Sequence, residues 1–383
     1  MPGRFGRFEM IRNLLGRFFP PKPQDRDPRR VDAFYEQGAA AFRAGQYAEA
    51  ANCAESALMH DPSLPALHFL LGSARFERGE HEAAEAAFTA CAGRSPPYPM
   101  ALHARMRAAC ARARIDLARG RRAQTLALPS DGRRVSVVIC SITPARFEKV
   151  CANYRSLLKD VPHEILGIHD ARSLCEGYNR GIQRATGDVL VFSHDDIEIA
   201  SPDFAARLLR HLENHDLVGI AGTSRLVSGN WINGGWPHLH GQVGSEVSKP
   251  GSLIVTVYQV AGPTAAGVEA LDGVFLAARR EVVERVRFDE ATFDGWHLYD
   301  LDFSLSAHAA GFRTAVCNDI CLIHESIGTY SEDWQRYARR FEQKHRERLR
   351  GRGELQATEL CWIEVASREE WLLMTQEMTG SAS

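Results

Sequence analysis

Several common signatures are missing from this sequence of 383 residues. It has no uninterrupted run of about 18 apolar residues, which a membrane-spanning helix requires, and no apolar segment of a secretory signal near its start. Basic and acidic residues nearly balance, 46 against 48, so no positive excess points to nucleic acid. Neither a P-loop nor a G-x-G-x-x-G dinucleotide fingerprint occurs.

Cysteine is present, but without the pattern of a disulfide framework. The nine cysteines are scattered along the chain without paired spacing, and their number is odd. Such usage suits a reducing compartment better than an oxidising one. We therefore expect a cytoplasmic protein.

The first 30 residues form a tail and linker with two interpretations. Residues 4–19 alternate arginines with aromatic and aliphatic residues, which on a helix would give a basic side and an apolar side. Such a helix can lie on an anionic surface, so one interpretation is peripheral contact at the inner face of the membrane. The other is a frayed tail or a helix packed on the protein body, because Gly6 and Gly16 weaken a helix.

A repeat with a period of 34 residues occupies positions 31–98. The matched pairs are Gly38 and Gly72, Gly45 and Gly79, Ala50 and Ala84, and Pro62 and Pro96. The period resembles that of the tetratricopeptide repeat, a pair of antiparallel helices per unit. In each unit the first glycine would let the helices approach closely, the second would lie at their turn, and the proline would end the second helix.

We expect an all-α repeat domain over residues 31–119, in which a helix from residue 99 caps the stack. Repeats of this kind have a concave surface that often binds peptides or helices, which would give the chain a protein partner. Alternatively, the helices only brace the domain that follows. Fold alone does not decide between the two.

Short β-branched segments alternate with helical ones after a polar linker at residues 120–133. We expect strands at 135–139, 164–168, 188–192, 218–221 and 314–323, and helices at 146–159, 174–185 and 202–215. This alternation predicts an α/β domain whose ligand lies at the carboxyl ends of the strands. Asp195 and Asp196 follow the third strand at that edge. They either hold a divalent cation, which compensates adjacent acids, or begin a turn or cap the next helix.

Further motifs follow in a fixed order. They are Tyr178-Asn179-Arg180-Gly181, Asp195-Asp196, Asp272-Gly273-Val274-Phe275, Phe288-Asp289-Glu290, Tyr299-Asp300-Leu301-Asp302, Gly311-Phe312-Arg313 and Ile323-His324. Together they resemble the family-two glycosyltransferases of the GT-A fold. The resemblance implies a GT-A domain with a Rossmann-like mixed sheet over residues 134–332, followed by a C-terminal helical extension at 333–383.

The resemblance also implies a reaction, the transfer of a sugar from a nucleotide-sugar donor to a glycan or protein acceptor with inversion. Asp195, Asp196 and His324 would hold Mn or Mg, which would stabilise the departing diphosphate. Asp300 would be the general base for the acceptor hydroxyl; the alternative is that Asp300 and Asp302 merely begin a helix. On a helix these two carboxylates cannot share a face, so only one would point into the cleft.

Other residues would bind the two substrates. For the nucleotide sugar the candidates are Cys140, Ser141, Asp170, Asn179, Asp195, Asp272 and Gly273. Trp231, Trp236 and Trp296 offer aromatic faces for an acceptor sugar. Residues 229–264 fit no period, and form either a substrate loop or a structural excursion over the sheet edge.

Two departures from the family pattern motivate a second hypothesis. Ser193 and Tyr299 stand where the family more often has acids. The chain would then be a repeat-based binding protein or scaffold with a catalytically degenerate transferase-like domain. A third hypothesis is a metal-dependent nucleotidyltransferase, which would release pyrophosphate instead of a nucleoside diphosphate.

Overall fold

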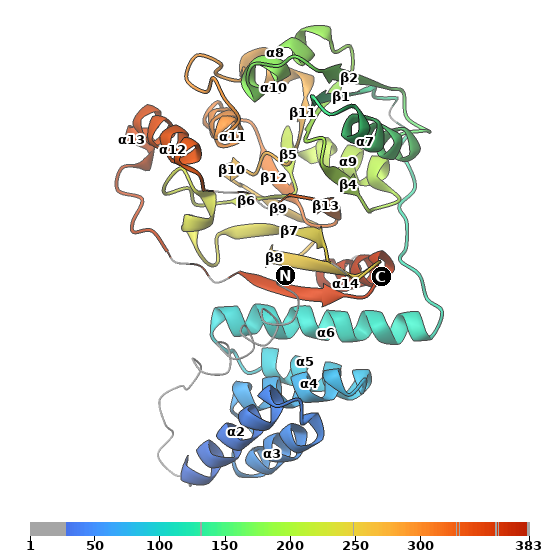
Figure 1. Cartoon of the computed structure of the whole chain (residues 1–383), viewed down its shortest axis with the longest axis vertical. Coiled ribbons are helices and arrows are strands. Elements are labelled where there is room, and N and C mark those ends of the chain that lie inside the picture. The colour runs from blue at the N-terminus through green and yellow to red at the C-terminus, as the bar shows by residue number, and fades with distance from the viewer. Residues whose placement is uncertain are drawn as a thin grey trace. The chain divides into compact units, whose positions relative to one another are not determined.

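The structure is a computed structural model that describes residues 28–380, apart from residues 131, 248, 327, 329, 357 and 359. Residues 4–19 lie outside this range, so both interpretations of that segment stay open. Within the described range, no helix combines the length and the apolarity needed to cross a bilayer. The chain divides into two compact units (Figure 1). The first comprises the residues up to Ala123 with 248–252 and 365–378, and the second comprises the remainder.

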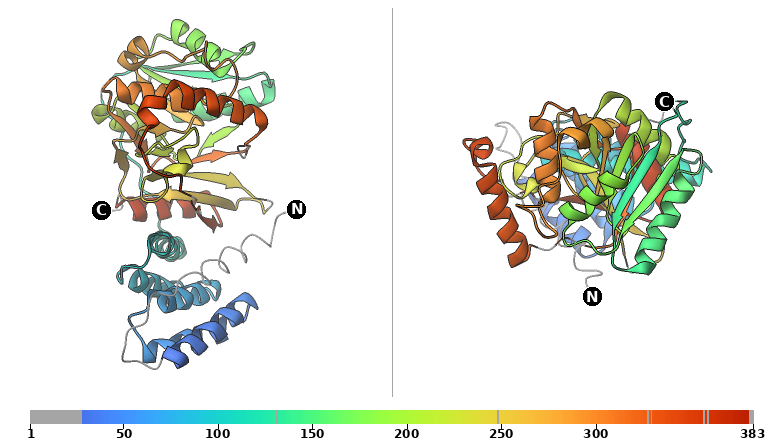
Figure 2. Two further views of the ribbon diagram at one scale, coloured as in Figure 1. Left: turned by 90° about the vertical axis from the view of Figure 1, so that its left-hand side faces the viewer. Right: turned by 90° about the horizontal axis from the view of Figure 1, so that it is seen from above.

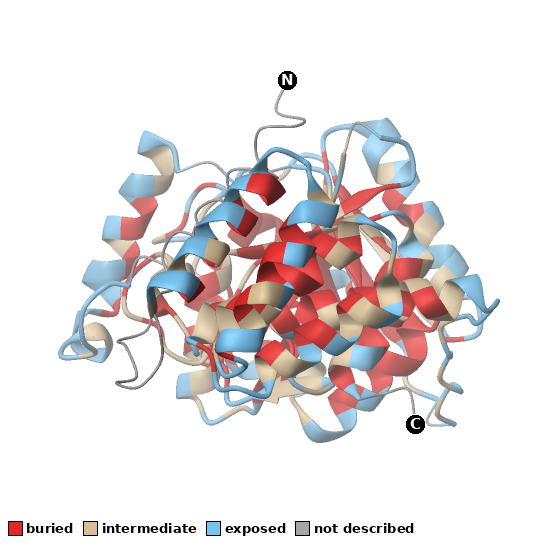
Figure 3. Cartoon of the chain, turned by 90° about the horizontal axis from the view of Figure 1, so that it is seen from below, coloured by how far each residue is buried: buried red, intermediate tan, exposed pale blue. Residues whose placement is uncertain are grey.

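The first unit is built from antiparallel helix pairs. Its helices are α2 (Pro28–Arg43), α3 (Tyr47–His60), α4 (Pro65–Glu77), α5 (His81–Ala92), α6 (Tyr98–Ala118) and α14 (Arg368–Thr379). Figure 2 shows α2 to α6 as successive layers. In the view coloured by burial, the helices alternate between buried and exposed residues, as expected where one face of each helix packs inward (Figure 3).

The repeat glycines confirm the predicted packing. A Cβ at Gly72 would lie 2.8 Å from the ring of Phe88, and one at Gly38 would lie 3.0 Å from the Cβ of Cys53. Each glycine therefore permits the close approach of the two helices in its unit. Gly45 and Gly79 occupy the turns with φ of 76° and 78°, a left-handed conformation that glycine adopts without steric cost.

The region at 333–383, expected as a helical extension, is divided between the two units. Its last helix, α14, belongs to the first unit, where buried Glu370 accepts a hydrogen bond from Nε of Arg114 at 2.7 Å. The thiol of Cys110 donates to the same carboxylate at 3.1 Å. The second unit contains α12 (Glu332–Lys344), α13 (Arg346–Leu349) and most of a strand, β14 (Cys361–Val365).

The second unit contains two mixed sheets of seven strands each. The first sheet has the order β2-β1-β3-β11-β5-β12-β9. Its strands are β1 (Val135–Cys140), β2 (His163–Ile168), β3 (Val189–Ser193), β5 (Leu217–Gly219), β9 (Thr264–Ala266), β11 (Phe275–Arg279) and β12 (Thr314–Cys317). β1 pairs in parallel with β2 and β3, whereas β11 runs antiparallel to β3.

The second sheet has the order β10-β6-β7-β13-β4, extended by β8 on β7 and by β14 on β8. Its other strands are β4 (Ile197–Ile199), β6 (Ala221–Thr223), β7 (Leu239–Glu246), β8 (Leu253–Gln259), β10 (Ala270–Leu271) and β13 (Leu322–His324). The segment at 229–264 therefore supplies two paired strands as well as a short 3₁₀ helix, η1 (Trp231–Gly234).

Helices cover both faces of the first sheet. Alternate residues of its central strands enter opposite cores, as the period of two in a strand requires. Val138, Leu190 and Phe192 belong to one core, and Val137, Ile139 and Val191 belong to the other. The first core is covered by α8 (Leu174–Arg184), α10 (Arg280–Arg285) and α11 (Tyr299–Ala309), and the second by α7 (Pro144–Leu157) and α9 (Phe204–Asn214). Burial on both sides explains the continuous apolar runs of these strands.

Two strand predictions are wrong. The segment 218–221, expected as one strand, is divided between β5 and β6, which belong to different sheets. A single strand was expected over residues 314–323, but β12 and β13 are separate and belong to different sheets. The break contains Asp319, whose carboxylate is buried against Nη1 of Arg207 at 2.9 Å and Nε2 of His211 at 2.6 Å. A buried carboxylate needs such partners. The segment between β12 and β13 is irregular where it places Asp319 against Arg207 and His211.

Candidate active site

The carboxyl ends of β1 and β3 form the predicted ligand edge. These parallel strands pair in register, with Ile139 opposite Ser193. The residues that follow each strand therefore meet, and the hydroxyl of Ser141 donates to Oδ2 of Asp195 at 2.6 Å. Because β11 is antiparallel to β3, with Phe275 opposite Ser193, the chain enters β11 at the same edge. Asp272 and Gly273 are thereby brought to this edge as well.

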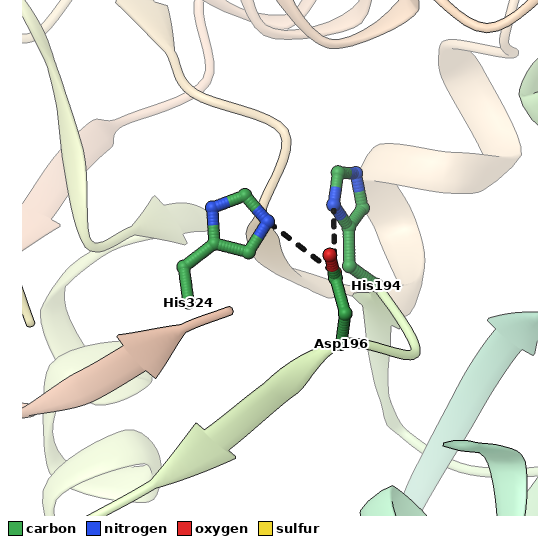
Figure 4. Close-up of side chains that lie close together, drawn as sticks. All are labelled: His194, Asp196 and His324. Atoms are coloured by element: carbon green, nitrogen blue, oxygen red, sulfur yellow. Dashed lines mark ion pairs between the residues drawn. The ribbon is translucent and has the colours of Figure 1, made fainter. Parts of the chain in front are cut away.

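His194, Asp196 and His324 form a cluster there (Figure 4). His194 and Asp196 lie between β3 and β4, and His324 ends β13. The register of β13 on β4 places His324 opposite Ile197, next to Asp196. Oδ1 of Asp196 is 3.7 Å from Nδ1 of His194 and 3.3 Å from Nε2 of His324. One ligand atom from each residue lies within 4.8 Å of the others.

The chemistry of this cluster fits a divalent metal ion. Two imidazoles and a carboxylate are ligands that first-row transition metals accept. Burial by itself would raise the pKa of Asp196, but hydrogen bonds with His324 and Ser326 and the charge of His324 help to outweigh it, and that pKa lies well below its usual range. The carboxylate is therefore ionised as a metal ligand must be. No other group of three such side chains occurs among the residues that the structure describes.

Asp195, expected among the metal ligands, lies instead against Ser141, as noted above. His194 takes part in the cluster in its place, and sequence reasoning gave it no role. The signal available was a histidine two positions before Asp196 on the same sheet edge as His324.

Asp300 lies in the first turn of α11. Its Oδ2 accepts a hydrogen bond from the backbone N–H of Gly273 at 2.7 Å. Burial, and then the neighbouring charge of Asp272, raise the pKa of Asp300 to about 7. A carboxylate with this pKa can take a proton near neutral pH. The preceding Leu298 has a φ of 63°, a left-handed conformation that costs a side-chain-bearing residue about 1 kcal/mol and sets the direction of the helix start.

Asp302 points away from Asp300, as expected for two residues this far apart on a helix. Its side chain is buried, with Oδ1 2.7 Å from Nζ of Lys344 and 2.7 Å from Nε2 of His345. Asp302 therefore joins α11 to the end of α12, whereas Asp300 faces the edge of the sheet.

The three tryptophans predicted to face an acceptor lie in different environments. Trp231 is buried, and its Nε1 donates to Oδ2 of Asp272 at 3.1 Å. Its ring also packs against that of Tyr258, with centroids 4.7 Å apart. Trp236 is half-buried, whereas Trp296 is 47% exposed. Of the three, Trp296 offers the most accessible aromatic face, and Trp231 holds Asp272 in place.

The remaining donor candidates differ in their accessibility. Cys140 is half-buried at the end of β1, and burial raises the pKa of its thiol to about 12, so the thiol stays neutral. Asp170 is exposed and pairs with Nη2 of Arg180 at 2.7 Å. Asn179 donates from its amide to the carbonyl of Phe288 at 2.9 Å, which ties α8 to the chain that leads into α11.

Comparison with known families identifies the class to which this architecture belongs. The sequence model of the Glycosyltransferase like family matches residues 136–345, which is more than half of the chain. A tetratricopeptide repeat model matches residues 31–64. The chain therefore belongs to the Glycosyltransferase like family, and the expected combination of a helical repeat region with an α/β mixed-sheet domain is confirmed.

Individual relatives are distant. The streptomycin biosynthesis protein StrF of Streptomyces griseus is 25% identical over 198 residues, a match that spans 50% of this chain and 66% of StrF. The mannosyltransferase PcManGT from Pyrobaculum calidifontis, solved with GDP-Man and Mn²⁺, is 14% identical, with a TM-score of 0.38 over 79% of this chain and 82% of that one. GalNAc-T7, solved with UDP, GalNAc and Mn²⁺, is 13% identical, with a TM-score of 0.34 over 57% of this chain and 50% of that one.

Proposed function

We propose that this protein is a metal-dependent, inverting glycosyltransferase that moves a sugar from a nucleotide-sugar donor to a glycan or protein acceptor. Family membership supports the reaction class. The observation that carries the mechanism is the placement of a cation-binding cluster and a candidate base at one sheet edge. The two are joined by Tyr299, which precedes Asp300 in the chain and whose hydroxyl lies 2.8 Å from Nε2 of His194.

The donor would lie across the ends of β1 and β3. We place its nucleotide near Cys140, Ser141 and Asp195, with Asp170 and Asn179 as further candidates along the sheet edge and Asp272 and Gly273 toward the sugar. A divalent cation held by His194, Asp196 and His324 would neutralise the charge of the departing diphosphate. Because two of the three ligands are imidazoles, we expect a transition metal such as Mn²⁺ in preference to Mg²⁺, which favours oxygen ligands.

Asp300 would act on the acceptor. Its Oδ2 is held by the N–H of Gly273, and in our proposal Oδ1 takes the proton of the attacking hydroxyl. The acceptor oxygen bonds to the anomeric carbon as the bond from that carbon to the diphosphate breaks. Attack on the face opposite the leaving group inverts the configuration.

Features outside the cluster bear on the acceptor, the protein partner and the location of the protein. Trp296 is the best placed of the three tryptophans to stack on a sugar of the acceptor. The helical repeats would bind a protein partner or a protein acceptor. None of the nine cysteines, all of them among the described residues, is in a disulfide, in accord with the cytoplasmic location that we propose.

The test is to incubate the full chain with a panel of nucleotide sugars, with and without Mn²⁺, and to follow nucleoside diphosphate release. We expect release from one donor, its loss on chelation, and large decreases in Asp196→Asn and Asp300→Asn. Glu281→Gln, an exposed change on α10, is the matched control. Full activity in both aspartate variants would overturn the mechanism. Donor binding without turnover would favour the binding protein, and pyrophosphate release from a nucleoside triphosphate would favour the nucleotidyltransferase.

A further inference from the structure

Tyr299 is the residue that departs from the acid typical of the family, and it is buried at the site. Its side chain is 3% exposed. The hydroxyl oxygen lies 3.0 Å from the carbonyl oxygen of Gly273 and 2.8 Å from Nε2 of His194. A tyrosine hydroxyl has one hydrogen to donate, so the direction of these two bonds can be worked out.

The carbonyl oxygen of Gly273 is an acceptor only. Two oxygens 3.0 Å apart in a buried site require a hydrogen between them, and Tyr299 alone can supply it. A tyrosine hydroxyl keeps its hydrogen near neutral pH. The hydroxyl therefore donates to Gly273 and accepts from His194. It follows that Nε2 of His194 carries a hydrogen.

This assignment fixes the chemistry of the other ring nitrogen. In the neutral imidazole with a hydrogen on Nε2, Nδ1 has a free lone pair. Nδ1 faces Oδ1 of Asp196 at 3.7 Å, too far for a direct hydrogen bond. Two electron-rich atoms that face each other at this distance are stabilised by a cation between them.

His324 is held differently. Its Nε2 lies 3.3 Å from Oδ1 of Asp196 and 3.2 Å from the hydroxyl of Ser326. The Ser326 hydroxyl can donate or accept, so this contact leaves the tautomer of His324 open. At His194 the tautomer is fixed, because the Gly273 carbonyl can only accept and so sets the direction of the Tyr299 hydroxyl.

We propose that Tyr299 is a positioning residue that fixes His194 in the tautomer whose Nδ1 binds a divalent cation. The inference deepens the proposed function and rests on it. Partners that orient a metal-binding histidine typically contribute about 10–100-fold to metal affinity. The residue that looks like a loss of an acid would thus support the cation site.

The first measurement is Mn²⁺ affinity by calorimetry on the full chain without donor. Tyr299→Phe keeps the ring that packs against Tyr178 and Phe288 and removes only the hydroxyl. We expect its Mn²⁺ affinity to fall about 10–100-fold. Tyr337→Phe is the matched control, because it removes a tyrosine hydroxyl from the same core, and the partner of that hydroxyl, Oδ1 of Asp294, takes no part in the cluster. We expect that variant to bind Mn²⁺ as the wild type does.

The second measurement is the tautomer of His194, read from ¹⁵N chemical shifts of the histidine-labelled, metal-free protein. The wild type and Tyr337→Phe should show hydrogen on Nε2, and Tyr299→Phe should show a mixture. An unchanged tautomer and unchanged Mn²⁺ affinity in Tyr299→Phe would overturn the inference, as would a wild type that binds no Mn²⁺. Mn²⁺ binding that depends on Tyr299 in a chain without transfer activity would uphold it while the proposed function fails.

Discussion

Two carboxylates at the same sheet edge have opposite electrostatic environments. Burial disfavours the charge of both Asp196 and Asp300. At Asp196 hydrogen bonds with His324 and Ser326 and the charge of His324 help to outweigh burial, and the pKa is lowered. At Asp300 the neighbour is another carboxylate, Asp272, which adds to burial and raises it. The groups next to each carboxylate, more than its burial, decide which aspartate remains charged and which can take a proton. Such divergence separates the roles of paired acids in many active sites.

The largest effect that would sharpen this comparison is expected from Asp300→Asn. The amide cannot accept the proton of the acceptor hydroxyl, so we expect the turnover number to fall by about 10²–10⁴-fold. Donor affinity and Mn²⁺ affinity, measured by calorimetry, should stay near the wild-type values. A variant with wild-type turnover would remove Asp300 from the mechanism.

Asp302→Asn, two residues away, tests whether the two acids of α11 differ in kind. Its carboxylate is buried against Lys344 and His345. Replacing it with an amide removes the charge that faces His345 and leaves Lys344 with Asp289 as its carboxylate partner. We expect a loss of about 3 kcal/mol in the free energy of unfolding, measured by urea denaturation. The folded fraction should keep its turnover number. If Asp302→Asn were fully stable but had lost turnover, Asp302 would be the catalytic acid of α11 and Asp300 the structural one.

The pH dependence is the next largest effect. Because the pKa of Asp300 is raised to about 7, its carboxyl group is protonated below that pH and cannot act as a base. Turnover at saturating donor and Mn²⁺ should therefore rise about tenfold per pH unit between pH 5 and 6.5 and level off above 7. A flat profile over this range would contradict the assignment.

The smallest effect is a shift of that profile in Asp272→Asn. This change removes the charge that raises the pKa of Asp300 together with burial, so the rising limb should move to lower pH. Asparagine can still accept the hydrogen bond from Trp231 through its carbonyl oxygen. If the rising part of the pH profile of Asp272→Asn stays at the wild-type pH, burial alone raises the pKa of Asp300.

Local sequence patterns predicted most of the fold. The β-branched runs that became β1 and β3 are buried on both faces, and this burial makes their pattern continuous and easy to identify. The repeat glycines were equally informative, because Gly72 packs against Phe88 and Gly79 adopts a left-handed turn. In these segments local preference and tertiary packing agree.

The misses have tertiary causes. β7 contains polar residues and glycines, and it is a strand because β6 and β8 pair with it. The break near Asp319 depends on Arg207 and His211, more than 100 residues away. In the candidate site, the place of His324 beside Asp196 follows from the register of β13 on β4. The sequence suggested Asp196, His324 and Asp300, but spacing alone could not show that His194 joins the cluster and that Asp195 turns to Ser141.

Gly273 joins the two halves of the site through a single residue of the backbone. Its N–H holds Asp300, and its carbonyl accepts from the hydroxyl that contacts His194. A Cβ at this position would overlap that hydroxyl and lie 2.7 Å from the Cβ of Asp300. Even the smallest side chain there would disturb leaving-group stabilisation and acceptor activation together, so this glycine sets a limit on how independently the two could evolve.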